Sequence, residues 1–240
     1  MKKKPLAIIT GAGTGIGKAL ALELLEKGIA IFAVGRRISL LKNLQKIDPK
    51  NIFILSSDVR KPAGRKKIVD TLPSSHTLRY LIHNAGIVTP VGSLKTLKLK
   101  TWRDAMQINV EAPLFLTQSL LPKMKEGRIL HISSGAAHFP IIHFTAYCAS
   151  KAALHMIYQC LNLELKKIKI AIGSVAPGII DTPMQNIIRS FPKKQFPDVD
   201  EFKGFKKNKK LISPEVCAKK LSDLLLNTPL KSFSKKEWWF

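Results

Sequence analysis

The stretch LAIITGAGTGIGKAL, residues 6–20, decides the fold of this chain. Its first four residues are apolar and include two β-branched isoleucines, which is typical of a buried strand. Glycines follow at 11, 13, 15 and 17, and apolar residues then recur at helical spacing up to Gly28, where the helix is expected to stop. A strand that passes into a helix through a tight glycine turn is typical of the start of a β-α-β unit.

The rest of the chain repeats this alternation of strand and helix. The expected strands are 29–34, 51–58, 78–86, 128–134 and 168–178, and the expected helices lie near 38–47, 62–72, 101–125, 145–167 and 214–226. Strands that are apolar throughout fit a parallel sheet covered by helices on both faces. The sequence therefore predicts an α/β fold, a single Rossmann-type domain over residues 1–240 with a doubly wound parallel sheet.

Composition narrows the class of protein. Apolar residues make up 45% of the chain, as in a globular domain, and no apolar run approaches the ~20 residues that a membrane span needs. The apolar part of the opening MKKKPLAII is too short for a secretory signal. The cysteines are odd in number and lack metal-type spacing, so they indicate free thiols of a reducing compartment. We expect a cytoplasmic protein with no membrane partner and no metal.

Net charge is the unusual feature. Lys+Arg 40 against Asp+Glu 16 gives +24, so nucleic acid has to be considered as a partner. The basic residues gather in segments 2–4, 65–67, 193–194, 206–210 and 235–236. These clusters match no recognition motif, so a solvated basic surface is favoured and nucleic-acid binding ranks last among the functions considered. A basic surface would also attract an anionic cofactor or substrate.

The glycine turn has the chemistry of a nucleotide site. Gly11, Gly15 and Gly17 give the spacing G-x-x-x-G-x-G, and a helix that begins there offers free N–H groups and its positive dipole end to a pyrophosphate. About 20 residues beyond such a turn, an acid would bind a ribose 2′-hydroxyl and an arginine would accept a 2′-phosphate. Arg36 and Arg37 follow the second strand. They favour NADP over NAD, the alternative being two surface arginines at a helix start.

Tyr147 and Lys151, in YCASK, lie about one helical turn apart and so share a helix face. A nearby ammonium stabilises a phenolate and lowers the pKa of the tyrosine, which makes it a better acid near neutrality. Taken alone, such a pair is most often a surface contact.

Together these residues resemble the short-chain dehydrogenase/reductase family over about residues 5–226. The motifs that carry the resemblance are TGAGTGIG (10–17), SSDVR with Asp58, HNAG (83–86), QINVEAP with Asn109, Ser134, YCASK (147–151) and PGIIDT (177–182). Ser134 stands 13 residues before Tyr147, the separation that the family shows. His83 replaces the family's first Asn, at a position of structural rather than chemical importance.

The resemblance implies a catalytic set and a cofactor site. Tyr147 would donate the proton and Ser134 would bind the substrate oxygen. Lys151 would hold the nicotinamide ribose, and Asn109 would hold a water that links Lys151 to solvent. The implied contacts with NADP are Gly11, Gly13, Thr14, Gly15, Ile16, Gly17, Arg36, Arg37, Asp58, Val59, Asn84, Ala85, Gly86, Tyr147, Lys151, Pro177, Gly178, Ile180 and Thr182. The implied substrate contacts are Ser134, Tyr147 and Gly178.

A narrower likeness, carried by ISSGAA, YCASKAALHM and VAPGIIDTPMQ, is to sepiapterin reductase and the bacterial benzil reductases. It implies reduction of a ketone or diketone. Sepiapterin reductase holds its pterin with an Asp near its C-terminus, whereas this chain has no Asp after Asp223, and Glu237 is its only late carboxylate. The alternative is a non-catalytic protein that binds NADP for regulation, which has no need of all four catalytic residues.

The sequence allows more than one role for three further features. Segment 184–210 interrupts the alternation of strand and helix, and it is expected either to cover the active site as a lid or to form a disordered basic loop. Trp238 and Trp239 would close the substrate pocket or enter a subunit contact. The histidines show no ligand pattern and are expected to be structural or pocket-lining: His83, His131, His138, His143 and His155. Because family members usually associate, a homodimer or homotetramer is expected.

Overall fold

The computed structural model describes residues 3–240, so Lys2 of the first basic cluster lies outside the described residues. Within them, seven strands form one parallel sheet in the order β3-β2-β1-β4-β5-β6-β7. The strands are β1 (Lys4–Thr10), β2 (Ala30–Gly35), β3 (Ile52–Ser56), β4 (His76–His83), β5 (Gly127–Ile132), β6 (Ile170–Ala176) and β7 (Trp238–Trp239). The predicted Rossmann-type sheet is confirmed, and β7 is an addition that the sequence pattern does not predict.

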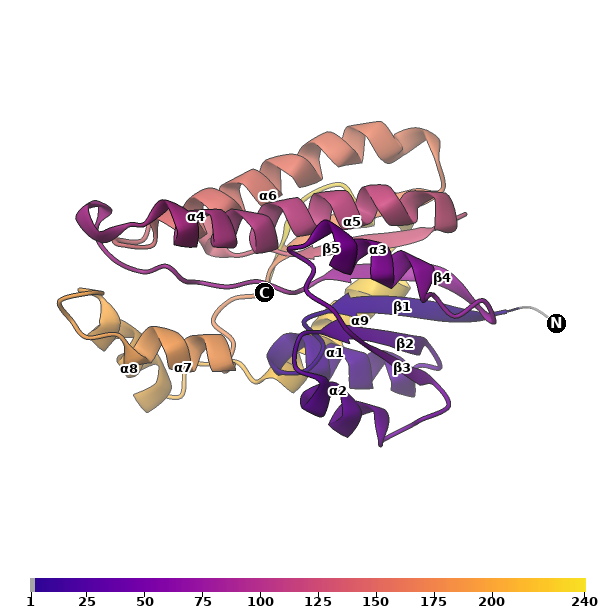
Figure 1. Ribbon diagram of the computed structural model, residues 1–240, viewed down its shortest axis with the longest axis horizontal. Coiled ribbons are helices and arrows are strands. Elements are labelled where there is room, and N and C mark those ends of the chain that lie inside the picture. The colour runs from indigo at the N-terminus through magenta and orange to yellow at the C-terminus, as the bar shows by residue number, and fades with distance from the viewer. Residues whose placement is uncertain (1–2) are drawn as a thin grey trace.

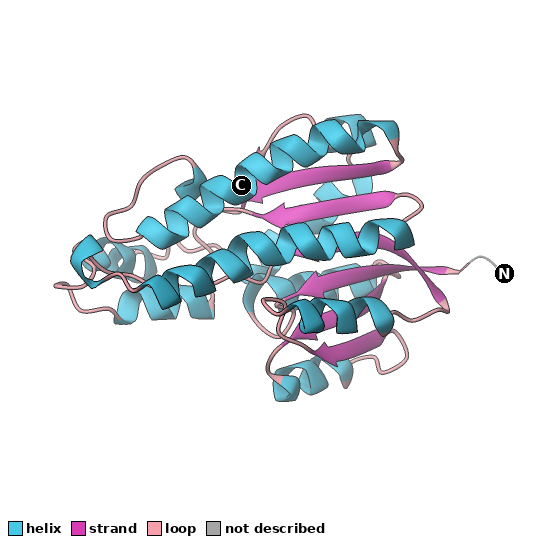
Figure 2. Ribbon diagram, turned by 45° about the horizontal axis from the view of Figure 1, so that its top comes forward, coloured by secondary structure: helices cyan, strands magenta, loops and turns pink. Residues whose placement is uncertain are grey.

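Helices cover both faces of the sheet (Figures 1 and 2). One face carries α1 (Gly15–Glu26), α2 (Ile38–Gln45) and α9 (Pro214–Asn227), and the other carries α3 (Pro62–Asp70), α5 (Ala112–Leu120) and α6 (Thr145–Glu164). Along β1, Ala7 and Ile9 pack into the first layer. Leu6 and Ile8 pack into the second. Both faces of this strand are therefore buried, which explains why its sequence is apolar throughout.

The strand order reverses between β1 and β4, which lie side by side although the chain visits β2 and β3 between them. In open parallel sheets, ligands bind at the carboxyl ends of the strands on either side of such a switch point. The glycine turn follows β1, and the HNAG motif continues from the end of β4. The topology thus brings two of the sequence motifs together.

The long helix expected over 101–125 is divided into several parts. It consists of α4 (Leu99–Met106), a π-helical turn η2 (Gln107–Glu111), α5 and a 3₁₀ turn η3 (Leu121–Lys123). Pro113 lies in the first turn of α5, where a missing N–H costs no helical hydrogen bond. The wide turn surrounds buried Asn109, as π-helical turns often do at functional residues.

Segment 184–210 forms helices instead of the disordered loop that was the alternative expectation. α7 (Pro183–Ser190) and α8 (Val199–Lys207) lie beyond the carboxyl ends of the strands (Figure 1). Phe196 is fully buried, and its ring centroid lies 4.7 Å from that of Phe144, just before α6. Tyr147 packs against the same apolar cluster. The segment is therefore joined to the start of the helix that carries the YCASK motif.

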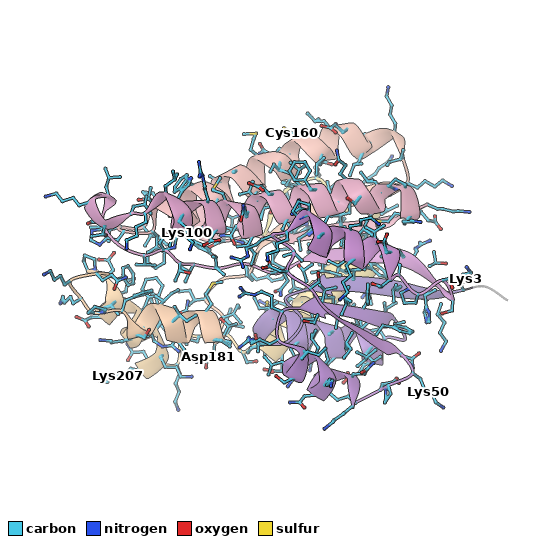
Figure 3. The ribbon with its side chains drawn as sticks, viewed as in Figure 1. Lys3, Lys50, Lys100, Cys160, Asp181 and Lys207 are labelled. Atoms are coloured by element: carbon cyan, nitrogen blue, oxygen red, sulfur yellow. The ribbon has the colours of Figure 1, made fainter. Side chains whose placement is uncertain are left out.

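The charge of +24 is spread around the molecule. Lys3, Lys50, Lys100 and Lys207 lie at widely separated points of its outline (Figure 3). This distribution fits the favoured interpretation of a solvated basic surface. Among the described residues, the helices are all too short or too polar to traverse a lipid bilayer.

Candidate active site

The glycine turn leaves the first turn of α1 open to a ligand. Thr14 is the N-cap of α1, and its side chain makes no capping hydrogen bond. Gly11 and Gly15 have positive φ values of 69° and 54°, which favour glycine. A Cβ at Gly17 would come within 2.4 Å of Asn84 Nδ2 and 2.5 Å of the Gly11 carbonyl oxygen. The turn therefore requires glycine for its own packing, and its N–H groups suit a phosphate.

Asn84 and Ala85, which follow β4, hold this turn in place. The Asn84 side-chain amide donates to the carbonyl oxygens of Thr10 (2.9 Å) and Gly11 (3.2 Å). Thr10 Oγ1 accepts hydrogen bonds from the backbone N–H groups of Asn84 and Ala85, both at 3.1 Å. The HNAG motif thus holds the backbone of the glycine turn in its observed conformation. His83 supports it from the core, where its Nε2 lies 2.8 Å from Thr117 Oγ1.

Two exposed arginines stand where β2 ends. Arg36 and Arg37 follow Gly35 directly, and Arg37 is the N-cap of α2. Within residues 3–240, neither pairs with a carboxylate. The charge of Arg36 contributes to the lowered pKa of nearby Asp58. This end of the sheet thus has the helix N–H groups of the glycine turn on one side and, on the other, two guanidiniums without carboxylate partners among the described residues.

Asp58 has a partner that the sequence reasoning missed. Arg60 Nη2 lies 2.7 Å from Asp58 Oδ2, and Arg60 Nη1 lies 2.9 Å from Asp104 Oδ1 on α4. The hydrogen bond with Arg60 is the main cause of the lowered pKa of Asp58. Val59, also expected at the cofactor, is buried. The D-x-R spacing is the only sequence signal for this pair, because Asp104 is remote along the chain.

Ser134, Tyr147 and Lys151 gather at the carboxyl end of β5. Ser134 follows this strand, and its Oγ accepts from Ala136 N at 3.2 Å. Tyr147 and Lys151 share one face of α6, with Lys151 Nζ 5.7 Å from the centre of the Tyr147 ring. Ser134 also acts on the Tyr147 hydroxyl, whose pKa it lowers against the effect of burial. The spacing of the motif thus gives the shared helix face that the sequence predicts.

The electrostatics of this group differ from the sequence prediction. Burial raises the pKa of Tyr147 above its ordinary value, and the hydrogen bond with Ser134 only partly opposes this shift. Lys151 is not among the groups that shift it, and its Nζ donates to the Ile132 carbonyl oxygen at 2.8 Å. Burial also lowers the pKa of Lys151 to about 8, with Glu237 opposing. The prediction of a lowered tyrosine pKa is therefore wrong for this structure.

Asn109 is buried and fully engaged by protein groups. Its Oδ1 accepts from Ile87 N at 2.9 Å, and its Nδ2 donates to Ile87 O and Ser150 Oγ, both at 2.9 Å. A Cβ at Gly86 would lie 3.2 Å from Asn109 Oδ1 and 4.0 Å from Lys151 Nζ. Asn109 therefore ties the chain after β4 to α6, next to Lys151. The water expected beside it stays a prediction.

The PGIIDT segment lies against the glycine turn. Gly178 has a φ of 80°, buried Ile180 bridges to Ile212, and Pro177 precedes them directly after β6. Thr182 is the N-cap of α7, and its Cγ2 would lie 3.1 Å from a Cβ at Gly15. The tertiary structure thus joins the two ends of the expected cofactor site, which are far apart in the sequence.

The end of the chain borders the Ser134 side of the site. Trp239 packs over Gly135 and lies 5.3 Å, between ring centroids, from His138. Two histidines also depart from expectation, since His138 and His155 meet at Glu237. The sequence shows no ligand pattern for this pair, because only folding brings together these residues that are distant in sequence.

A doubly wound sheet with a glycine turn at its switch point and a Ser–Tyr–Lys group beside it points to an oxidoreductase that binds a nicotinamide cofactor. The chain belongs to the short chain dehydrogenase family, whose model matches residues 5–193. This match confirms the resemblance on which the sequence interpretation rests.

Individual relatives cover nearly the whole chain. A benzil reductase ((S)-benzoin forming) of Bacillus cereus is 33% identical over 232 residues, 91% of this chain and 92% of the relative. The solved structure of the KRED1-Pglu enzyme is 30% identical with a TM-score of 0.88, and the match covers 99% of this chain and 100% of that one. L-sorbose reductase from Gluconobacter frateurii, solved with NADPH and L-sorbose, is 25% identical with a TM-score of 0.86, and covers 100% and 95% of the two chains.

Proposed function

We propose that this chain is an NADPH-dependent carbonyl reductase that acts on a ketone or diketone. The observation that carries the proposal is the group formed by Ser134, Tyr147 and Lys151, in which Ser134 acts on the Tyr147 hydroxyl and Lys151 Nζ lies 5.7 Å from the centre of the Tyr147 ring. It stands at the edge of the sheet where the glycine turn and the PGIIDT segment meet. The similarity to the Bacillus cereus benzil reductase supports a substrate with adjacent carbonyls.

The choice of NADPH rests on Arg36 and Arg37. They are exposed and free of carboxylate partners within the described residues, and the position that would hold an acid for NAD has none. The glycine turn would hold the pyrophosphate, and Thr182 and Ile180 would lie near the nicotinamide. L-sorbose reductase, a structural neighbour, was solved with NADPH.

The side chains then supply what the cofactor does not. When bound, the reduced nicotinamide provides the hydride. The raised pKa of Tyr147 keeps its hydroxyl protonated at neutral pH, which is the form that donates a proton to the substrate oxygen. Ser134 would donate a second hydrogen bond to that oxygen. Lys151, with its pKa of about 8, would pass a proton toward Tyr147, and Asn109 would hold the backbone beside it.

A pterin is not the favoured substrate. Glu237, the only carboxylate late in the chain, is engaged by Ser174 Oγ at 2.7 Å and by His138. It is 5% exposed, so it does not offer a carboxylate to a pterin. We propose instead that Trp239 and the helices of segment 184–210, acting as a lid, form apolar walls for an aromatic or branched diketone.

NADPH oxidation with a panel that contains benzil, a simple ketone and sepiapterin tests this function. We expect turnover with benzil and a loss of at least about a hundredfold in Tyr147→Phe, because the proton donor is removed. Tyr158→Phe is the matched control, since Tyr158 lies on the same helix and its hydroxyl donates to Ser234 O. NADPH binding without turnover of any carbonyl would instead support the non-catalytic, regulatory alternative.

We propose that the protein is cytoplasmic and that it assembles as a homodimer or a homotetramer.

A further inference from the structure

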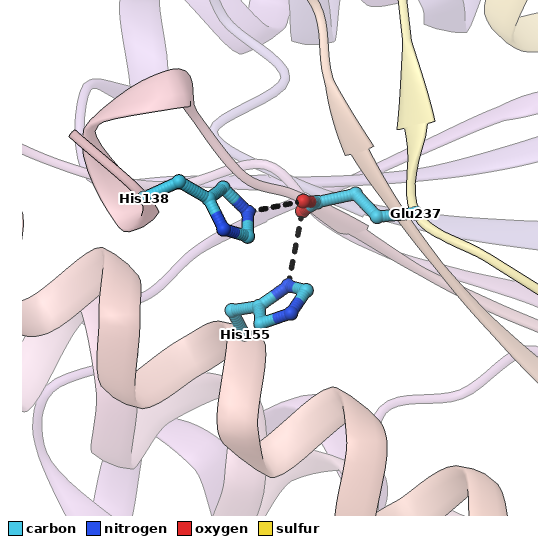
Figure 4. A group of neighbouring side chains, drawn as sticks. All are labelled: His138, His155 and Glu237. Atoms are coloured by element: carbon cyan, nitrogen blue, oxygen red, sulfur yellow. Dashed lines mark hydrogen bonds and ion pairs between the residues drawn. The ribbon is translucent and has the colours of Figure 1, made fainter.

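Two histidines and a glutamate from three separate elements meet at one point (Figure 4). His138 follows the 3₁₀ turn η4 (Gly135–Ala137), His155 lies on α6 one turn beyond Lys151, and Glu237 immediately precedes β7. Glu237 Oε2 lies 2.5 Å from His138 Nε2, and Glu237 Oε1 lies 3.3 Å from His155 Nδ1. One ligand atom from each residue can be chosen so that all three lie within 4.8 Å of one another.

The carboxylate at the centre of this cluster needs a cation. Its side chain is 5% exposed, and an unbalanced charge at such a position is costly. Across residues 3–240, no lysine or arginine forms an ion pair with Glu237; its only ion-pair partners are the two imidazoles. The Lys151 ammonium interacts with this carboxylate only from beyond ion-pair distance. A cation in direct contact is therefore either a proton on an imidazole or a metal ion between the three side chains.

The ring of His155 is held between Gln159 and Glu237. The amide nitrogen of Gln159 donates to His155 Nε2 at 3.1 Å. This contact leaves the other ring nitrogen, Nδ1, facing the carboxylate.

Nδ1 is buried and makes no hydrogen bond, although it stands 3.3 Å from Glu237 Oε1. A divalent ion that displaces the ring proton of this nitrogen would satisfy both groups.

We propose that His138, His155 and Glu237 bind one divalent transition-metal ion, of which zinc is the best match. Two imidazoles and a carboxylate are a ligand set that zinc accepts, with a water completing a tetrahedral site. The surrounding groups have the arrangement that holds ligands in place, since Ser174 donates to the carboxylate and Gln159 contacts the far nitrogen of His155. His138 is 30% exposed, which leaves a path for the ion and the water.

The ion would fasten the end of the chain to the catalytic helix. Trp238 and Trp239 pair with β6 directly after Glu237, and Trp239 packs over Gly135, the neighbour of Ser134. The site is separate from the reacting groups, because Tyr147 lies two helical turns from His155 on α6. Its role is therefore structural: it fixes a wall of the substrate pocket.

Zinc binding by the purified full chain, after removal of metals with a chelator, tests the proposal. We expect calorimetry and elemental analysis to give one zinc per chain. Cobalt should give the visible absorption of a tetrahedral site. His138→Asn and Glu237→Gln should weaken zinc binding by at least about 100-fold, and Ser174→Ala by roughly 10- to 100-fold, as loss of an outer partner typically does.

Two controls separate this site from other ligands on the surface. His76→Gln removes a histidine at the start of β4, and Cys160→Ser removes an exposed thiol; both should still bind one zinc. Because His138 is partly exposed, the His138→Asn variant is expected to fold. A cooperative thermal transition of this variant in the presence of chelator checks that it does. Zinc should raise the Tm of the wild type and not that of this variant.

Failure has two clear forms. If the metal-free wild type takes up no zinc or cobalt, the cluster is an imidazolium–carboxylate ion pair only, and the proposal is overturned. It is equally overturned if His138→Asn and Glu237→Gln bind zinc as tightly as the wild type. Neither result bears on carbonyl reduction, which is measured separately with NADPH.

Discussion

Lys151 is the residue whose chemistry the fold changes most. Its ammonium is buried against the Ile132 carbonyl oxygen at 2.8 Å, and burial lowers its pKa from 10.5 to about 8. Since the charged form is disfavoured in the folded state, this residue costs stability at neutral pH. We infer that the cost is tolerated because a lysine that titrates near neutrality can pass protons to Tyr147.

Lys151→Met should therefore increase stability while it abolishes turnover. Below pH 8 the wild type carries a buried charge that the variant lacks. As pH rises from about 8 to 10.5, the folded wild type loses this proton before the unfolded chain does, so wild-type stability increases. The free energy of unfolding of the variant should exceed that of the wild type by less at the upper end of this window, the change being on the order of 3 kcal/mol. Urea unfolding of both proteins at the two ends of the window measures it, and a pH-independent difference would contradict the pKa shift.

Arg36 sets the choice of cofactor at the residue scale. Arg36→Ala should raise the KM for NADPH by roughly 10- to 100-fold, because a charge-assisted hydrogen bond contributes about 1.5–3 kcal/mol. The KM for NADH should change little, since NADH has no 2′-phosphate. Steady-state kinetics with both cofactors checks this, with Arg103→Ala, an exposed arginine on α4, as the control. Equal effects on the two cofactors would refute the assignment.

At the scale of elements, α6 connects the parts of the site. It carries Tyr147 and Lys151 on one face, receives the apolar cluster of segment 184–210 at its start, and presents His155 one turn further on. Asn109 in the π-helical turn donates to Ser150 of the same helix. A change in any of these contacts is therefore expected to reach the catalytic pair through α6.

Phe196→Ala tests the coupling between the lid and the active site. Phe196 is fully buried against Phe144, so the substitution should cost about 3–5 kcal/mol of stability. The KM for the diketone should rise by more than the KM for NADPH, because the lid borders the substrate side. Ile68→Ala removes a buried side chain of α3. It should lower stability without raising the KM for the diketone more than the KM for NADPH. An identical kinetic profile for the two variants would remove the case for a lid.

At the scale of the whole molecule, some large apolar side chains on the outer helices are exposed. Phe115 on α5 is 39% exposed, and Met156 and Leu163 on α6 are 57% and 66% exposed. Large apolar side chains that are exposed to this extent are expected to be covered by another subunit. The proposed homodimer or homotetramer would use this face.

Size-exclusion chromatography with light scattering should therefore give a dimer or tetramer at micromolar concentration. The double variant Met156→Glu and Leu163→Glu should shift it toward a monomer, because it places charges in an apolar contact. Ile47→Glu, at an apolar position 57% exposed after α2, should leave the assembly unchanged. A wild-type monomer would exclude this interface.

The sequence alone determined the doubly wound sheet, the glycine turn and the shared helix face of Tyr147 and Lys151. These features depend on periodicity and short spacings, which are local properties of the chain. The family resemblance added Ser134 and Asn109, which lie near Tyr147 and Lys151 in the structure. The helix ends, the π-helical turn and β7 could not be predicted from the sequence, because packing against remote residues decides them.

Only the tertiary structure decided the electrostatics of the site and the cluster at Glu237. The pKa of Tyr147 rises because neighbours from several elements exclude water, and burial cannot be read from the four-residue spacing to Lys151. Glu237 and His138 are 99 residues apart in sequence, so no local pattern connects them. Desolvation and ligand geometry are properties of three-dimensional surroundings, which the chain acquires only when it folds.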